Sequence, residues 1–68
     1  MMNRLLKLKQ EKNRIKTDII KLKSFIGTTK YYTLSSMQQA LLCEQELIMA
    51  SLYRILVLRI DELEDDAN

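Results

Sequence analysis

The 68-residue chain contains a single cysteine and no histidine. One cysteine cannot form an intrachain disulfide. Without imidazole, the chain lacks the commonest general base, the usual activator of a nucleophilic serine or cysteine, and a principal zinc ligand. So small a domain is marginally stable unless a disulfide, a metal or a partner chain supports it. We therefore expect association with other chains, no enzyme activity and no cofactor.

Proline is absent and glycine occurs once, so nothing interrupts long helices. Hydrophobic residues make up 47%, charged residues 29% and aromatic residues 6%, which is typical of helical or coiled-coil proteins. The charge is unevenly spread: residues 1–30 hold nine basic and two acidic groups (+7), and residues 31–68 hold two basic and seven acidic groups (−5). These halves attract each other in an antiparallel hairpin.

The first predicted helix covers about residues 3–26. Its apolar positions are spaced three and four residues apart, which is a heptad pattern, with one lysine among them: Leu5, Leu8, Lys12, Ile15, Ile19, Leu22 and Ile26. Asn3 is a candidate N-cap, and Gly27 is placed where glycine commonly ends a helix.

Residues 27–34 are expected to form a loop that reverses the chain. Ser35 and Gln38 match a capping box that begins a second helix, over about residues 35–65. This helix has two apolar stripes, one of Met37, Leu41, Ile48, Ile55 and Leu58, the other of Leu42, Met49, Leu52, Leu56 and Leu63. A helix that packs on one neighbour needs one stripe. The sequence therefore predicts one all-α domain over residues 1–68, an antiparallel two-helix hairpin that pairs at least into a four-helix dimer.

Two arginines and the loop are the candidate binding residues. Arg54 and Arg59 interrupt the most apolar stretch of the chain, where a guanidinium pairs either with a carboxylate of another chain or with a ligand phosphate. The loop offers Thr28, Thr29, Lys30 and Tyr31 beside Tyr32. Two adjacent tyrosines cannot both point inward. An exposed ring near a lysine suits a flat anion such as a nucleotide.

Other classes of site find little support in the sequence. The acidic residues near the C-terminus, Asp61, Glu62 and Asp65, are expected to be solvated rather than to bind a metal. The lysines of the first helix surround it on all sides, so we expect them to keep the bundle soluble rather than to bind nucleic acid. The most apolar run, residues 47–60, is too short to cross a membrane. A cytoplasmic location follows as an expectation.

From Glu11 onward the spacing of residues resembles a family of small phage proteins. These are helical hairpins named after crAss-like phages, and they include the anti-CBASS cyclic-oligonucleotide sponges of tailed phages. The matching positions are Glu11, Lys12, Ile15, Ile19, Lys21, Leu22, Phe25, Ile26, Tyr32, Leu34, Ser35, Gln39, Leu41, Leu42, Gln45, Met49, Tyr53, Leu56, Arg59 and Ile60.

The resemblance implies a homohexamer, a trimer of dimers, acting in the host cell cytoplasm. It implies that cyclic dinucleotides and cyclic trinucleotides are sequestered between subunits without being altered, which would deprive CBASS-type immunity of its signal. The resemblance favours Arg59 as a ligand-binding residue, because it matches the Arg-Ile motif of the family, whereas the loop after Phe25 and Ile26 varies within the family. Together with the candidates taken from the residues themselves, the predicted ligand-binding residues are Arg59, Lys30, Thr28, Thr29, Tyr31, Lys21 and Arg54. The alternative is a structural or adaptor bundle that binds a protein partner or nucleic acid.

Overall fold

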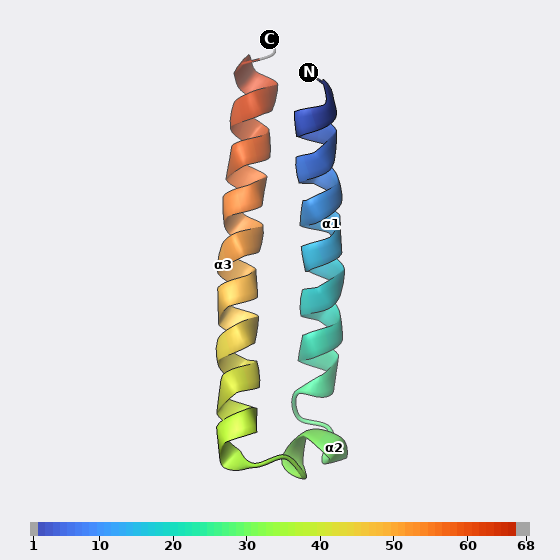
Figure 1. Ribbon diagram of the computed structural model, residues 1–68, viewed down its shortest axis with the longest axis vertical. Helices are drawn as coiled ribbons and strands as arrows, with labels where there is room; N and C mark the ends of the chain where they lie inside the picture. The colour runs from blue at the N-terminus through green and yellow to red at the C-terminus, as the bar shows by residue number, and fades with distance from the viewer. Residues whose placement is uncertain (1, 67–68) are drawn as a thin grey trace.

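The computed structural model describes residues 2–66 as an antiparallel helical hairpin (Figure 1). Helix α1 spans Met2–Phe25, the short α2 spans Thr29–Tyr32, and α3 spans Ser36–Asp66. The start of α1 and the end of α3 lie at one end of a rod of 50 × 14 × 14 Å, which we call the open end; α2 lies at the other, the closed end. The predicted all-α hairpin is thus what the described residues form. Residues 1, 67 and 68 of the predicted domain lie outside them.

The contact between α1 and α3 follows the predicted heptad. Every member of the α1 pattern, from Leu5 to Ile26 and including Lys12, is buried or half-buried. Leu8, Leu56 and Ile60 form the buried cluster, and Leu5, Ile15 and Leu63 pack against it. The second predicted stripe of α3, apart from Leu52, is therefore the one that contacts α1.

Of the three capping residues that the sequence predicts for the long helices, the structure confirms two and contradicts one. Gly27 follows α1 with φ of 95°, a left-handed conformation that glycine adopts without strain. Ser35 Oγ accepts a hydrogen bond from Gln38 N at 3.1 Å, so it is the N-cap of α3. The prediction that Asn3 caps α1 is wrong, because the helix already includes Met2.

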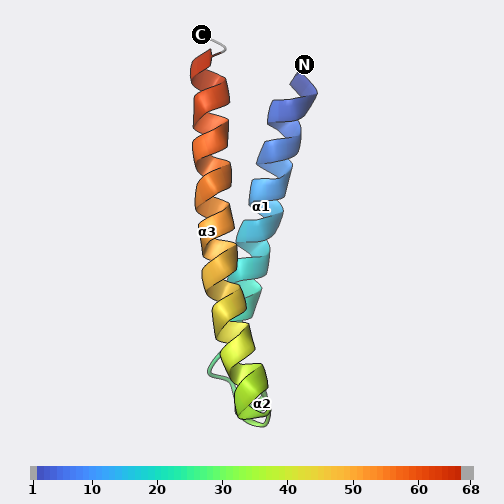
Figure 2. The same cartoon turned by 60° about the vertical axis from the view of Figure 1, so that its left-hand side comes forward.

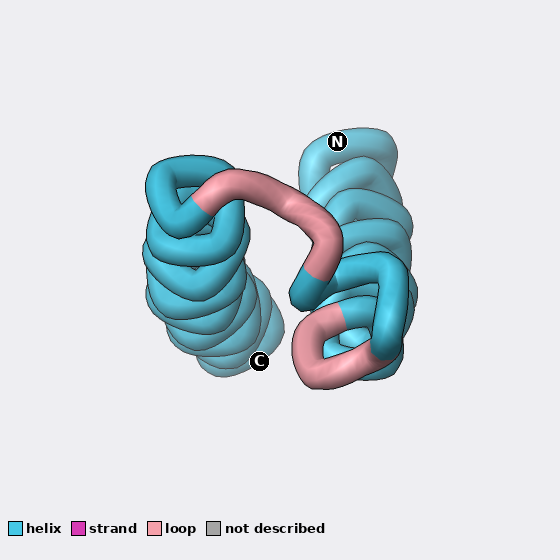
Figure 3. The backbone as a smooth tube through the Cα atoms, turned by 90° about the horizontal axis from the view of Figure 1, so that it is seen from below, coloured by secondary structure: helices cyan, strands magenta, loops and turns pink. Residues whose placement is uncertain are grey.

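The connection is more ordered than the predicted loop over residues 27–34. It contains α2, which Figure 3 shows as a single turn between two short loops. Thr28 begins this turn: its side-chain oxygen accepts a hydrogen bond from Tyr31 N at 3.3 Å, and its carbonyl accepts one from Tyr32 N at 3.2 Å. A single turn is too short to show a helical periodicity, which is why the sequence pattern missed it.

The other stripe of α3 faces solvent. We define the outer stripe as Met37, Leu41, Ile48, Leu52 and Ile55, with exposed fractions between 36% and 67%. Leu52 was predicted to belong to the stripe that contacts α1, and this assignment is wrong. Leu47 and Leu58, on the same helix, are also exposed. The prediction of two apolar faces is thus confirmed, and within this hairpin one of them is uncovered.

Two ion pairs join the oppositely charged helices. Lys9 Nζ lies 3.4 Å from Glu64 Oε2, and Lys23 Nζ lies 3.7 Å from Glu46 Oε1. Both pairs are at least partly solvated, so each contributes at most about 1 kcal/mol. Figure 2 shows α1 and α3 diverging toward the open end, the end at which Glu64 lies.

Candidate functional site

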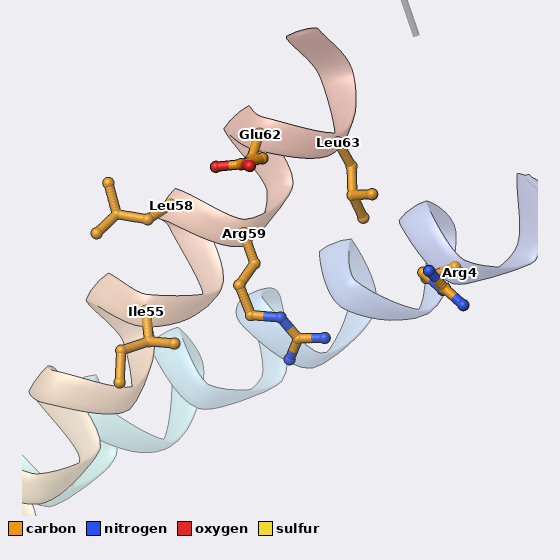
Figure 4. A pocket seen from close by; sticks show the side chains of 6 residues that line it. All are labelled: Arg4, Ile55, Leu58, Arg59, Glu62 and Leu63. Atoms are coloured by element: carbon orange, nitrogen blue, oxygen red, sulfur yellow. The ribbon is translucent and has the colours of Figure 1, made fainter. Parts of the chain in front are cut away.

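A hollow of about 340 Å³ lies near the open end of the hairpin. Its lining, drawn in Figure 4, combines three charged and three apolar side chains: Arg4, Arg59, Glu62, Ile55, Leu58 and Leu63. Only Arg4 comes from α1; the other five come from the last three turns of α3. The hollow therefore depends on the packing of the two helices, not on either helix alone.

Helical spacing places these side chains together. Ile55, Arg59 and Glu62 are four and three residues apart, so they lie along one face of α3. Leu63 packs against the buried cluster, and this packing anchors the inner wall of the hollow. Figure 4 shows the Arg59 side chain extending from α3 toward α1, the helix that carries Arg4.

The electrostatic balance of the hollow is positive, with two guanidinium groups and one carboxylate. Among the side chains that the structure describes, the ion pairs within 4.0 Å are Lys9–Glu64 and Lys23–Glu46, so neither arginine has a carboxylate partner there. Guanidinium groups bind phosphate through two parallel hydrogen bonds, and the apolar side chains beside them can contact the flat face of a base. The hollow thus has the chemistry of a site for an organic phosphate.

Tyr31, predicted to contact ligand, is buried at the closed end and is only 6% exposed. Its ring stacks with that of Phe25, at a centroid distance of 6.2 Å, and with that of Tyr32, at 5.1 Å. Its hydroxyl donates to Gln39 O at 3.2 Å and lies 3.3 Å from Cys43 Sγ. The hydrogen bond with Cys43, with burial adding to it, raises the pKa of Tyr31 to about 12. Tyr31 therefore joins the connection to α3, and Tyr32, 67% exposed, is the tyrosine that faces solvent.

The threonines and lysine of the connection also lie at the closed end. Thr28 Oγ1 donates to Phe25 O at 2.7 Å while it caps α2, so its hydrogen-bonding capacity is largely used within the chain. Thr29 and Lys30 are exposed. Of these three residues, Thr29 and Lys30 keep side chains free to meet a ligand at the surface.

One chain does not bring the predicted site residues together. Arg59 is 23 residues from the start of α3, which corresponds to about 35 Å along the helix. Thr28, Thr29, Lys30 and Tyr31 are consequently remote from it, and Lys21 is an exposed residue near the closed end of α1. Arg54 is also exposed; five residues from Arg59, it points about 140° away around α3 and is not part of the hollow.

Sequence reasoning missed Arg4 and did not connect Glu62 with Arg59. The antiparallel arrangement of the two predicted helices was enough to predict that Arg4 lies near the end of α3. In an antiparallel pair of helices, residues at the start of the first lie beside residues near the end of the second, as Lys9 lies beside Glu64. Continuing that pairing by one turn and a half would have placed Arg4 next to the end of α3.

The described residues contain no group of three or more cysteine and acidic side chains that could hold a metal ion. Over the same part of the chain, no helix is both long enough and apolar enough to cross a membrane.

A comparison with models of protein families shows to which family the chain belongs. The model of the Sequestin family matches residues 2–62, which is nearly the whole hairpin. The chain belongs to the Sequestin family. The family name is consistent with a sequestering function, which agrees with the coarser part of the resemblance drawn from the sequence. Searches of curated proteins and of solved structures gave no match.

Proposed function

We propose that this Sequestin-family protein sequesters cyclic dinucleotides or cyclic trinucleotides between identical subunits. It releases them chemically unchanged. In this proposal it is a phage protein that acts in the host cytoplasm and deprives CBASS-type immunity of its second messenger. The hollow at the open end contributes part of the binding surface.

The observation that carries the proposal is the pair of guanidinium groups of Arg4 and Arg59 in a hollow that also has three apolar side chains. Among the described side chains, neither has a carboxylate within 4.0 Å. A cyclic oligonucleotide presents phosphate groups and flat bases close together. Arginine recognises the first of these, and apolar side chains contact the second. Membership of a family named for sequestration supports the same conclusion.

The separation of the candidate residues supports binding between subunits. Arg59 and the Thr28–Tyr31 connection are about 35 Å or more apart within one chain. The outer stripe offers a surface over which further copies can pack, and antiparallel packing would bring the closed end of one copy toward the open end of another. The proposed assembly is a homohexamer, formed as a trimer of dimers.

Calorimetry with a panel of cyclic dinucleotides and cyclic trinucleotides tests the proposal. We expect at least one of them to bind, and Arg59→Ala to weaken that binding about tenfold to a hundredfold, because hydrogen bonds to charged groups contribute about 1.5–3 kcal/mol. Arg14→Ala is the matched control: it removes an exposed guanidinium that lies outside the hollow. Chromatography of the released ligand should return the unmodified compound.

The absence of binding at ligand concentrations of tens of micromolar would contradict the proposal and favour the adaptor alternative. Equal affinity of the Arg59→Ala and wild-type proteins would remove Arg59 from the site. Native mass spectrometry of the same samples measures the number of subunits, and an assembly other than six chains would correct the proposed homohexamer.

A further inference from the structure

The hollow at the open end contains one carboxylate that phosphate binding does not require. Glu62 lines it together with Arg4 and Arg59. Among the described side chains, the acidic partners of the ion pairs are Glu46 and Glu64, so Glu62 has no cation within 4.0 Å. A carboxylate close to a phosphate site weakens that site, because like charges repel. Glu62 therefore opposes ligand binding unless it contacts a part of the ligand that donates hydrogen bonds.

The charged groups of the hollow point to different sides of α3. Ile55, Leu58 and Glu62 are three and four residues apart, so they share a face of the helix. Figure 4 shows the guanidinium group of Arg59 extending toward α1, away from the carboxylate of Glu62. The hollow thus has a cationic side next to α1 and an apolar side that ends at a carboxylate.

The size of the hollow suits one nucleotide unit of a cyclic oligonucleotide. Ligand pockets usually measure about 300–1,000 Å³, and the hollow, with about 340 Å³, is at the small end of this range. With a phosphate on the cationic side, the attached base lies over Ile55 and Leu58, which are both exposed. The edge of that base is then the part of the ligand that meets Glu62.

A carboxylate distinguishes the four bases by the donors on this edge. An ionised carboxylate accepts hydrogen bonds and donates none, and its two oxygens can accept two parallel bonds. Guanine presents two adjacent donors on its Watson–Crick edge, the N1–H group and the N2 amino group. Adenine presents one donor, the N6 amino group, beside the lone pair of N1, which repels a carboxylate. Cytosine and uracil likewise have a single donor next to an acceptor.

We propose that Glu62 makes the hollow selective for guanine. Its carboxylate accepts hydrogen bonds from the N1–H and N2 amino groups of a base whose phosphate is bound by Arg59 and Arg4. This inference rests on the proposed function and specifies the ligands within it, namely cyclic dinucleotides or trinucleotides that contain guanine. Glu62 determines the choice of base, whereas the two guanidinium groups supply the attraction for phosphate.

Calorimetry with three cyclic dinucleotides tests the choice of base. Cyclic diguanylate should bind about tenfold more tightly than cyclic diadenylate, because a charged acceptor that loses its donors stays unsatisfied. Cyclic di-inosinate keeps the N1–H group and lacks the N2 amino group, so its affinity should lie between the two. Equal affinities for cyclic diguanylate and cyclic diadenylate would overturn the proposal.

The variant Glu62→Gln tests the residue itself. Loss of the negative charge tightens the binding of every anion, so the readout is the ratio of the affinities for cyclic diguanylate and cyclic diadenylate. This ratio should fall about threefold or more, because an amide offers one donor and one acceptor, a pattern that matches adenine. Asp61→Asn removes the same charge from an exposed position outside the hollow, and it should leave the ratio unchanged. A wild-type ratio in Glu62→Gln would also overturn the proposal.

The outcomes separate the role of Glu62 from the proposed function. Cyclic nucleotides that bind with no preference for guanine would leave the proposed function intact and overturn the role of Glu62. If no cyclic nucleotide binds, the proposed function fails, and NMR titration with guanosine and adenosine monophosphates at millimolar concentration decides the role of Glu62. Tighter binding of the guanosine compound, lost in Glu62→Gln, would support that role. Equal binding of the two compounds, or no binding of either, would overturn it.

Discussion

The substitution Ile48→Asp tests whether the hairpin exists as a single chain or associates with further copies through the outer stripe. Ile48 lies at the centre of the outer stripe and is 61% exposed, so the single chain buries only about two fifths of it. Full burial of an isoleucine side chain is worth about 1.5–3 kcal/mol. In an isolated hairpin, the substitution should therefore cost about 1 kcal/mol of the free energy of unfolding.

The cost is larger if a second copy covers the stripe. The remaining three fifths of the side chain then become buried on association, which contributes about 1–2 kcal/mol per chain and about 2–4 kcal/mol per dimer. Losing that contribution raises the dimer dissociation constant about 30-fold to 700-fold, at about 1.4 kcal/mol for each factor of ten. Desolvation of the introduced carboxylate adds to the loss.

The assay is sedimentation together with urea unfolding, at two protein concentrations that differ a hundredfold. The wild-type unfolding midpoint should rise with protein concentration, because association stabilises the folded chain. For Ile48→Asp this dependence should disappear, and the chain should sediment at lower mass. An unchanged mass and an unchanged concentration dependence would refute the reasoning that the outer stripe is an interface.

Leu56→Ala provides the contrast. Leu56 is 1% exposed and belongs to the cluster between α1 and α3, so its truncation should cost about 2–5 kcal/mol in the folding of the hairpin itself. The loss should appear at every protein concentration at which the chain is examined. Different behaviour of the two variants would separate the packing inside one chain from the packing between chains.

Two further predictions concern the closed end. Gly27→Ala should lower the free energy of unfolding by about 1–2 kcal/mol in urea titration, because φ of 95° strains a residue that has a Cβ. The added methyl group would meet no neighbour, so backbone strain is the only cost. An unchanged unfolding midpoint would contradict this reasoning. The pKa of Tyr31, raised from 10.0 to about 12, predicts that the difference between the ultraviolet titrations of wild type and Tyr31→Phe has its midpoint near pH 12. The pKa of Tyr31 is higher in the folded chain than in the unfolded chain, so its contribution to the free energy of unfolding is fully present below pH 10 and is lost as the pH rises from 10 to 12. A titration midpoint near pH 10 would show that the hydrogen bond with Cys43 does not favour the neutral phenol.

The sequence by itself determined the helices and their apolar faces. Positions spaced three and four residues apart, from Leu5 to Ile26, indicated which side of α1 is buried, and the structure confirms each of them. Two stripes on α3 indicated two packing surfaces, since a heptad pattern is a property of one helix and can be read without its partner. Gly27 and Ser35 marked the ends of the long helices, because capping depends on the residue and its immediate neighbours.

Only the tertiary structure decided which stripe of α3 contacts α1, which tyrosine is buried, and which cations share a hollow. Each of these depends on contacts between segments that are distant in sequence. Leu56 and Ile48 look equally apolar in the sequence, yet one is 1% exposed and the other 61%. Arg4 and Arg59 are 55 residues apart, and antiparallel packing brings them to the same hollow. Local patterns specify what a helix can bury, whereas the relative placement of two helices determines what each of them does bury.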